Sequence, residues 1–217
     1  MKGLVIGFPK CGTTTIHEAC TKSDLRSAHW RVPGGYCGQL IYERYLSGQD
    51  PLIDFKDYDV ITQADVCRPA QGLNFWPNLD PAVLLAIRRY HPECCFILNV
   101  RDTDKLIASI TRWYNLRQFI IDSDIVGLPA GYGDKDEHLR NWIEGHYRTC
   151  RSIFGNDGNF VELPITEDDS SRQILEKALG VAIEWWGVAP QTVADAVGKG
   201  KKSRVGKKSK RMALQTI

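Results

Sequence analysis

A stretch near the N-terminus combines the residue types that hold phosphate groups in proteins. Residues 4–16 read LVIGFPKCGTTTI, an apolar strand-like run followed by a glycine-bounded loop with one lysine and a threonine-rich helix start. Backbone N–H groups at such a helix start can converge on one anion, and a lysine and hydroxyl groups add charge and further donors. The residues that we expect to bind the anion are Lys10, Cys11, Gly12, Thr13, Thr14 and Thr15.

The spacing of this loop differs from that of the nucleoside triphosphate P-loop, G-x-x-x-x-G-K-[ST]. Gly7 and Gly12 keep the glycine spacing, but Thr13 stands where that loop has its lysine. The lysine of this chain, Lys10, comes two residues before the second glycine instead. The sequence therefore predicts a phosphate site of the P-loop kind with a displaced lysine, and a plain turn between strand and helix is the alternative.

A second set of polar residues follows the strand-like run 96–100. Arg101 leaves the end of that run, and Ser109 comes eight residues later, two turns into the helix that we expect next. An arginine and a serine so placed can hold a second phosphate between them. The alternative is that Asp102 caps the helix and Arg101 forms a surface ion pair. Because the first loop is also present, we favour the second phosphate site.

Strand-like and helix-like segments alternate along the chain, which is the order of an α/β fold. We expect a single α/β domain with a central parallel sheet flanked by helices, and in such sheets ligands bind beyond the carboxyl ends of the strands. Residues 66–80 and 122–134 are expected to be loops. The expected strands are 2–6, 27–32, 57–63, 95–100 and 159–163, and the expected helices are about 13–21, 36–46, 81–90, 103–119, 137–154 and 169–179.

Composition places the chain among soluble globular proteins. It has 217 residues, of which 43% are apolar and 25% charged, enough for one domain with a full core. The N-terminal apolar run is interrupted within ten residues by Gly7, Pro9 and Lys10, so we expect neither a secretory signal nor a membrane span. Seven cysteines without a C-x-x-C pair predict a reducing, cytoplasmic location and no metal site.

The C-terminal residues form a separate electrostatic region. Residues 199–211 contain eight basic residues and no acidic one, which leaves 20 basic against 26 acidic residues in the rest of the chain. We therefore divide the chain into an α/β domain, 1–197, and a basic tail, 198–217. A non-enzymatic module that binds nucleic acid through this tail is one interpretation. No aromatic residue interleaves with the tail's lysines, however, so we do not expect it to stack on bases.

Together the two motifs resemble the sulfotransferase family, whose members take a sulfuryl group from 3′-phosphoadenosine 5′-phosphosulfate (PAPS). The family's 5′-phosphosulfate loop has the form P-K-[SC]-G-T-T, which residues 9–14 match, and its 3′-phosphate motif is matched by Arg101, Asp102 and Ser109. The resemblance covers about residues 3–182, strongly at the two motifs and weakly between them. It implies a P-loop-containing, sulfotransferase-like fold, PAPS as donor, 3′-phosphoadenosine 5′-phosphate (PAP) as product, and no metal.

Two departures from the family pattern bear on the donor site. Thr103 stands where the family usually has proline, which removes no ligand. The C-terminal Arg-Lys-Gly loop that closes on the 3′-phosphate in cytosolic members has no clear copy, although residues 198–202, GKGKK, have the composition to take its place. The basic tail is therefore either part of the donor site or a solvated terminus.

Sulfuryl transfer needs a group that stabilises the leaving phosphate and a base that takes the acceptor's proton. Lys10 is the candidate for the first role, by its charge and by the family resemblance. In the family, the base is a histidine or carboxylate near the end of one of the two strands after the P-loop helix, and His29 and Asp65 fit this position. His29 has the better intrinsic pKa and Asp65 the better location, so both stay candidates.

The expected acceptor is a hydroxyl, or as second choice an amine, of a small molecule or glycan. A P-loop kinase or nucleotide triphosphatase is the main rival enzyme, favoured by the glycine spacing and disfavoured by the missing lysine after Gly12. We assign His17 and Glu18 to the surface of an amphipathic helix, with a Glu18 that faces the acceptor as the alternative, and give His146 no chemistry. Aromatic residues that can line an acceptor pocket, or belong to the core, are Trp30, Tyr36, Phe75, Trp76, Trp113 and Tyr114.

Overall fold

A seven-stranded sheet forms the centre of the computed structural model, which describes residues 1–166 and 168–189. Five strands are parallel and neighbour one another in the order β2 (Ser27–His29), β5 (Val60–Gln63), β1 (Gly3–Val5), β8 (Cys95–Val100) and β9 (Phe160–Pro164). Two short strands, β3 (Arg31–Val32) and β4 (Gly35–Tyr36), extend the β2 edge in antiparallel pairing. The expected α/β fold with a central parallel sheet is thus confirmed.

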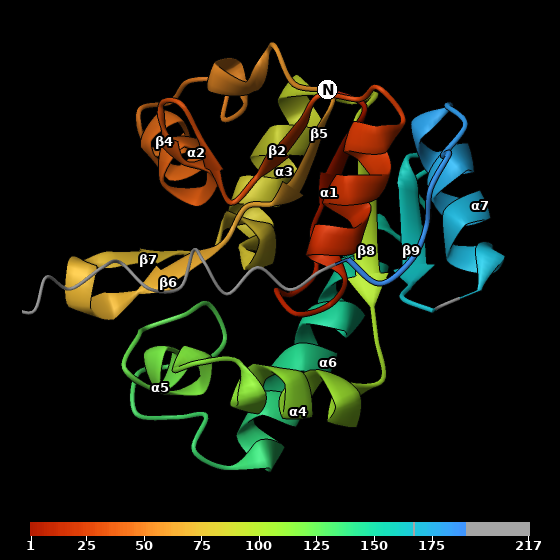
Figure 1. Ribbon diagram of the computed structural model, residues 1–217. Helices are drawn as coiled ribbons and strands as arrows, with labels where there is room; N and C mark the ends of the chain where they lie inside the picture. The colour runs from red at the N-terminus through yellow and green to blue at the C-terminus, as the bar shows by residue number, and fades with distance from the viewer. Residues whose placement is uncertain (167, 190–217) are drawn as a thin grey trace, which may run out of the picture.

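Helices cover both faces of this sheet (Figure 1). On one face lie α1 (Thr13–Lys22) and α7 (Asp169–Leu179), and on the other lie α2 (Cys37–Leu46), α3 (Pro81–Tyr90) and α6 (Asp136–Phe154). Alternate strand residues face the two layers: Val5 and Ile97 pack with α1 and α7, whereas Leu4 and Phe96 pack with the other helices. Burial on both faces explains why these strands read as continuous apolar runs in the sequence.

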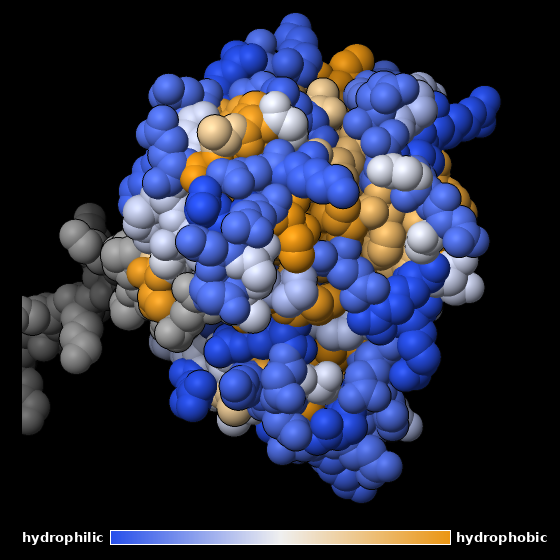
Figure 2. All heavy atoms as spheres, turned by 90° about the vertical axis from the view of Figure 1, so that its right-hand side faces the viewer, coloured by the Kyte–Doolittle hydropathy of each residue, from blue (hydrophilic) through white to orange (hydrophobic). Residues whose placement is uncertain are grey.

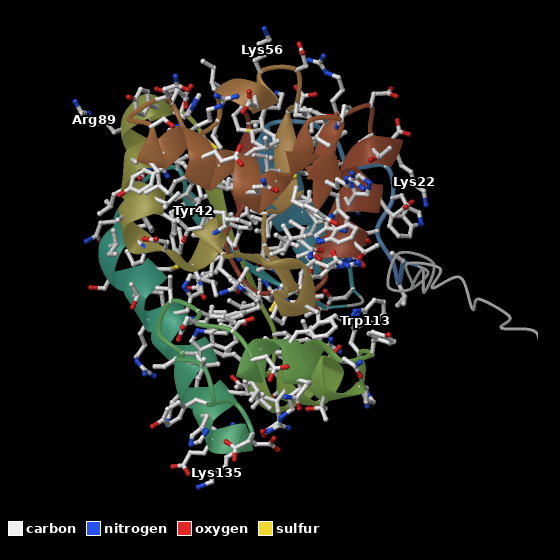
Figure 3. The ribbon with its side chains drawn as sticks, turned by 90° about the vertical axis from the view of Figure 1, so that its left-hand side faces the viewer. Lys22, Tyr42, Lys56, Arg89, Trp113 and Lys135 are labelled. Atoms are coloured by element: carbon white, nitrogen blue, oxygen red, sulfur yellow. The ribbon has the colours of Figure 1, made fainter. Side chains whose placement is uncertain are left out.

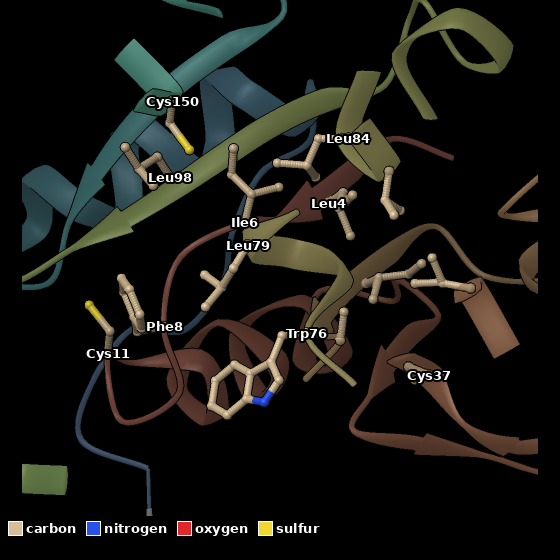
Figure 4. Packing of buried hydrophobic residues seen from close by; sticks show 14 of the residues in the cluster. Leu4, Ile6, Phe8, Cys11, Cys37, Trp76, Leu79, Leu84, Leu98 and Cys150 are labelled. Atoms are coloured by element: carbon tan, nitrogen blue, oxygen red, sulfur yellow. The ribbon is translucent and has the colours of Figure 1, made fainter. Parts of the chain in front are cut away.

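The larger core reaches from the sheet to the loop that follows β1. In Figure 4, Leu98 of β8 and Ile6, the residue after β1, lie in this core, and Phe8 enters it from the beginning of the loop. The Phe8 ring packs edge-on against Trp142, with ring centroids 4.8 Å apart. An aromatic anchor thus fixes the place where the chain leaves the central strand.

Two expected segments near the carboxyl edge of the sheet were predicted wrongly. The expected strand 27–32 ends at His29, because Trp30 has a left-handed φ of 59° and turns the chain back into β3. The expected loop 66–80 contains the antiparallel hairpin β6 (Val66–Arg68) and β7 (Leu73–Phe75), with short 3₁₀ turns on either side of β7. Gly72, with a φ of 69°, supplies the left-handed residue that this tight hairpin needs.

The expected helix 103–119 is also wrong in its length, because it is two helices. They are α4 (Thr103–Arg112) and α5 (Leu116–Ile121), separated by a break in which Tyr114 has a φ of 43°. The remaining helices and strands lie where the sequence predicts them. For example, α3 begins after Asp80, whose carboxylate accepts hydrogen bonds from two backbone N–H groups of the first turn.

Hydrophilic side chains cover most of the face beside α7, with hydrophobic ones visible between them (Figure 2). No helix among the described residues has the length and apolar character needed to cross a membrane. The basic tail expected at 198–217 lies outside the described residues, as does the boundary that we placed before it.

Candidate active site

A cleft of about 1180 Å³ lies at the carboxyl edge of the parallel strands. The segments that follow β1, β2, β5, β8 and β9 all contribute to its wall, which is where α/β sheets bind ligands. The fold brings both sequence motifs to this one cavity. Its lining includes Lys10, Gly12, Thr13, Thr14, Thr15, His29, Asp65, Arg101 and Ser109.

The loop between β1 and α1 has the backbone geometry of an anion-binding nest. Lys10 and Gly12 have left-handed φ angles of 64° and 74°, which turn successive N–H groups toward the same side. The N-terminus of α1 has no side-chain cap. The N–H groups of residues 10–15 make no hydrogen bond to any residue in 1–166 or 168–189, so six donors remain for a ligand at the positive end of a helix.

Asn99, near the end of β8, holds this loop from below. Its side-chain oxygen accepts a hydrogen bond from the N–H of Gly7 at 2.9 Å, and its amide nitrogen donates to the carbonyls of Phe8 at 3.3 Å and Cys11 at 2.6 Å. A Cβ on Gly7 would clash with this amide, so the glycine is needed for close approach. Asn99 has no role among our predictions, although a polar residue inside a buried apolar run is a usable signal.

Two further buried side chains bind the backbone at the start of the loop. The Asn78 amide donates to the carbonyl of Gly7 at 2.8 Å, and His146 Nε2 donates to the carbonyl of Ile6 at 2.7 Å. Because that ring is buried, its pKa is lowered to about 4, and it acts as a neutral donor. We assigned no chemistry to His146, and its place under the loop is a structural one.

Cys11 is the predicted loop ligand whose side chain does not reach the cleft. Its Sγ lies in the core beside Phe8 (Figure 4) and donates to the carbonyl of Asn99 at 3.4 Å. Burial raises the pKa of this thiol to about 12, so it stays protonated. Only the backbone N–H of Cys11 is available to a ligand.

Lys10 lies against the ring of Trp113, with its Nζ 3.3 Å from the ring centroid. Trp113 stands in the break between α4 and α5, and in Figure 3 it lies on the side of these helices that faces the rest of the cleft. Partial burial, and then the nearby charge of Arg101, lower the pKa of Lys10 to about 8. An anion in the cleft would therefore meet an ammonium that is partly stripped of water.

Arg101 lies directly behind the loop, where its Nη1 donates to the carbonyl of Lys10 at 3.2 Å. Its neighbour Asp102 caps α4 by accepting from the N–H of Lys105 at 2.9 Å. Within the described residues Arg101 has no carboxylate partner, and the Ser109 hydroxyl makes no hydrogen bond. The helix-cap alternative is thus right for Asp102, while Arg101 keeps donors for an anion.

Asp65, just beyond β5, is 4% exposed. Burial raises the pKa of its carboxyl to about 7, against a smaller lowering by a hydrogen bond from the side chain of Gln63. That bond runs from Gln63 Nε2 to Asp65 Oδ2 at 3.1 Å, and Gln63 Oε1 accepts from the Thr13 hydroxyl at 3.2 Å. Gln63, which is not among the predicted site residues, therefore links the anion loop to this carboxyl.

His29, at the end of β2, lies in a different setting from Asp65. Its ring is stacked on that of His17, and its Nδ1 lies 3.0 Å from the hydroxyl of Thr62. Burial, with a smaller contribution from the adjacent His17, lowers the pKa of His29 to about 3. The ring is therefore neutral near pH 7 but is a weak base.

The aromatic residues that we considered divide between the cleft and the core. Trp30, Trp113 and Tyr114 line the cleft, whereas Trp76 is 2% exposed and packs in the core. Tyr36 and Phe75 are not among the lining residues. Glu18 and His17, which we assigned to a helix surface, do line the cleft, so that assignment was too simple.

No protein-family model matches the chain, and its comparison with curated proteins gives no match. Across residues 1–166 and 168–189, no three or more His, Cys, Asp or Glu side chains are grouped so as to hold a metal ion. A function for the chain is therefore inferred from the chemistry of the cleft itself.

Proposed function

We propose that this chain is a sulfotransferase that transfers the sulfuryl group of PAPS to a hydroxyl, or as second choice an amine, of a small molecule or glycan. The observation that carries the proposal is that two anion-binding groups open into one cleft. The first is the set of N–H groups of residues 10–15 with Lys10, and the second is Arg101 with Ser109. PAPS has two separate anionic groups, a 5′-phosphosulfate and a 3′-phosphate.

The two ends of the donor are assigned by the chemistry of each group. The N-terminus of α1 and the Lys10 ammonium suit the 5′-phosphosulfate, since both concentrate positive charge at one point. Arg101 and Ser109 suit the 3′-phosphate, because a guanidinium and a hydroxyl donate to two phosphate oxygens at once. The displaced lysine of the loop then has a reason, because this donor carries no magnesium-bound triphosphate.

In the proposed step, the acceptor oxygen attacks sulfur in line with the bond between sulfur and the bridging oxygen. The new S–O bond forms on the acceptor, the old one breaks, and its electron pair stays on the phosphate of PAP. Lys10 stabilises the negative charge that grows on that oxygen. The acceptor's proton passes to a carboxylate or imidazole that lines the same cleft.

Asp65 is better suited than His29 to act as the general base. A base acts best when its pKa lies near the working pH, and the Asp65 pKa of about 7 meets that condition while the His29 pKa of about 3 does not. Gln63 also connects Asp65 to Thr13 in the donor loop, which fixes base and donor relative to each other. We therefore assign proton removal to Asp65 and treat His29 separately below.

A cytoplasmic location is part of the same proposal. All seven cysteines are free thiols, and all are buried. Free buried thiols suit a reducing compartment.

Isothermal titration calorimetry with the full chain tests the donor directly. We expect PAP to bind in the presence of a metal chelator, with an affinity at least tenfold higher than that of ATP with magnesium. Transfer of labelled sulfate from PAPS to a mixed panel of hydroxyl and amine compounds then tests the reaction. Magnesium-dependent ATP binding with no PAP binding would overturn the proposal in favour of a P-loop kinase or nucleotide triphosphatase.

A further inference from the structure

His17 on α1 and His29 at the end of β2 form a stacked pair on the wall of the cleft. Their ring centroids are 4.7 Å apart and their planes differ by 19°. Hydroxyl groups hold the Nδ1 edge of both rings: Ser27 Oγ lies 2.8 Å from His17 Nδ1, and Thr62 Oγ1 lies 3.0 Å from His29 Nδ1. The opposite edges carry the two Nε2 atoms.

The hydrogen-bond network sets the tautomer of both rings. We assign the proton of the Thr62 hydroxyl to the carbonyl of Ala28, 3.2 Å away, because that carbonyl can only accept whereas His29 Nδ1 can also donate. With this assignment, Thr62 Oγ1 accepts from its other neighbours, His29 Nδ1 and Ser27 Oγ, the latter at 3.3 Å. Since Ser27 spends its proton on Thr62, it accepts from His17 Nδ1. Both imidazoles therefore carry their proton on Nδ1 and present a bare lone pair at Nε2.

The two Nε2 atoms are open to a ligand. Both rings line the cleft, and neither Nε2 makes a hydrogen bond to the residues in 1–166 and 168–189. Neither is among the buried polar atoms that lack a partner, so both are reachable from solvent. Burial lowers the pKa of His17 and of His29, so both rings stay neutral near pH 7 and act as acceptors only.

The surrounding side chains narrow the class of ligand. A ligand that satisfies two adjacent acceptors must carry two adjacent donors, as neighbouring hydroxyls or an amine do. Arg31 and Arg68 line the same cleft, with their guanidinium groups 5.3 Å from the Tyr36 ring and 4.9 Å from the Trp30 ring. Glu18 and Asp65 line the cleft as well, so charge does not choose between an ammonium group and a polyol, and we commit to the polyol because the proposed reaction takes a hydroxyl first.

We propose that His17 and His29 select a polyhydroxylated acceptor, such as a saccharide, by accepting hydrogen bonds at both Nε2 atoms from hydroxyls that are not sulfated. This inference rests on the proposed sulfotransferase function and assigns the acceptor for it. Asp65 receives the proton of the reacting hydroxyl, while the histidine pair holds its neighbours. The pair is thus a specificity element and takes no part in bond making.

Side-chain nitrogen NMR of the unliganded protein tests the tautomers without any turnover. We expect both rings to give spectra of a protonated Nδ1 and a bare Nε2, and Thr62→Val to disturb both rings at once, since Thr62 anchors the network. A proton on Nε2 of either ring in the native protein would overturn the inference. This result is independent of whether PAPS is the donor.

Acceptor kinetics with PAPS test the recognition itself. The probes are methyl hexosides, their mono-deoxy analogues, an amino sugar and para-cresol, which has a single hydroxyl. We expect His17→Leu to raise the KM of the best hexoside roughly three- to tenfold with little change in kcat. His17→Gln, whose side-chain oxygen still accepts a hydrogen bond, should bring this KM most of the way back to the native value. Para-cresol should be the poorest acceptor. Equal use of para-cresol, preference for the amino sugar, or a loss in kcat alone would overturn the inference.

PAP calorimetry separates the two possible failures. Tight PAP binding together with para-cresol as the best acceptor would remove the polyol assignment and leave the sulfotransferase proposal intact. Absence of PAP binding would remove the sulfotransferase proposal, and with it the acceptor assignment. The expected result is tight PAP binding by the native protein, His17→Leu and His17→Gln alike.

Discussion

The two ends of the cleft are built in different ways. At the proposed donor end, one contiguous loop, residues 7–15, offers its backbone N–H groups, and Asn99 fixes that loop with three hydrogen bonds. At the proposed acceptor end, side chains from α1, β2, β5 and the β6–β7 hairpin line the cleft, and those of α1, β2 and β5 are joined through hydroxyl and imidazole groups. A backbone site tolerates little variation in its ligand, whereas a wall of side chains can be changed one residue at a time. We therefore expect substitutions at the two ends to have distinct kinetic signatures.

Asp65→Asn should have the largest effect on activity. An amide cannot take the acceptor's proton, so kcat should fall roughly 10²- to 10⁴-fold while PAP affinity is kept. Steady-state kinetics and calorimetry measure the two quantities. His29→Gln is the matched control from the same wall, and it should change the acceptor KM more than kcat. If His29→Gln were the more damaging substitution in kcat, the base would be His29.

The Asp65→Asn variant should also be more stable than the native protein at neutral and alkaline pH. The folded-state pKa of Asp65 is raised from 3.8 to about 7, so the native protein loses stability as the pH rises from about 4 to about 7. Asn removes that loss, and the gain should grow over this window to roughly 4 kcal/mol. Urea unfolding at about pH 4 and about pH 8 measures it. An equal effect of the substitution at both pH values would contradict the burial of a carboxylate here.

Lys10→Ala tests the donor end and should lower kcat roughly 10²- to 10³-fold, because the charge on the leaving phosphate is no longer stabilised. Lys22→Ala is the matched control, since this lysine lies at the other end of α1, pairs with Glu18 and does not line the cleft. The pH profile of the native protein's activity should also show the ionisation of Lys10. Activity should rise as Asp65 ionises near pH 7 and fall as Lys10 loses its proton above about pH 8. Near-normal sulfuryl transfer by Lys10→Ala would refute the central role of the loop.

Asn99→Ala should damage the donor end through its support. The substitution leaves the N–H of Gly7 and the carbonyls of Phe8 and Cys11 without their buried partner, which we expect to cost roughly 2 to 4 kcal/mol of stability. PAP affinity should fall roughly tenfold or more, with the acceptor KM little changed. Asn159→Ala is the control, because its exposed amide donates only to the carbonyl of Pro92 and lies away from the cleft. Unchanged PAP affinity in a folded Asn99→Ala protein would show that the Asn99 amide is not needed to keep the loop in its binding conformation.

The donor end could be predicted from the sequence in more detail than the acceptor end, and the reason is physical. The loop from Gly7 to Thr15 is a single short segment, so the spacing of its glycines, lysine and threonines is enough to predict an anion-binding turn. The parallel sheet was predictable for the same reason, because burial on both faces leaves continuous apolar runs. The polar Asn99 inside an apolar run is a local signal, but its contact with a loop 92 positions away is not encoded by any local pattern.

Three features of the cleft could not be predicted from the local sequence. Trp30 takes a left-handed conformation that its residue type does not favour, so the strand 27–32 looked continuous. The break at Trp113 and Tyr114 lies inside an amphipathic pattern, which continues from one helix into the next. His17 was assigned to the surface of α1, because its ring partner, His29, lies on a different element, the strand β2. Each of these features depends on tertiary packing, which overrides local propensity.

Trp113→Leu should have the smallest effect and tests where the two ends meet. The Trp113 ring holds the Lys10 ammonium at 3.3 Å in the unliganded cleft, an attraction worth about 0.5 to 2 kcal/mol. Leucine keeps an apolar contact but removes the ring's charge distribution, so the pKa of Lys10 should fall further and the alkaline limb of the pH profile should move to lower pH. PAP affinity should change only about two- to tenfold, and Trp113→Phe should recover most of that change, since phenylalanine keeps an aromatic face. If Trp113→Leu raised PAP affinity, the ring would be competing with the donor for Lys10 and not orienting it. That result would mean that the contact between Trp113 and Lys10 lowers the affinity for the donor and is broken when the phosphosulfate binds.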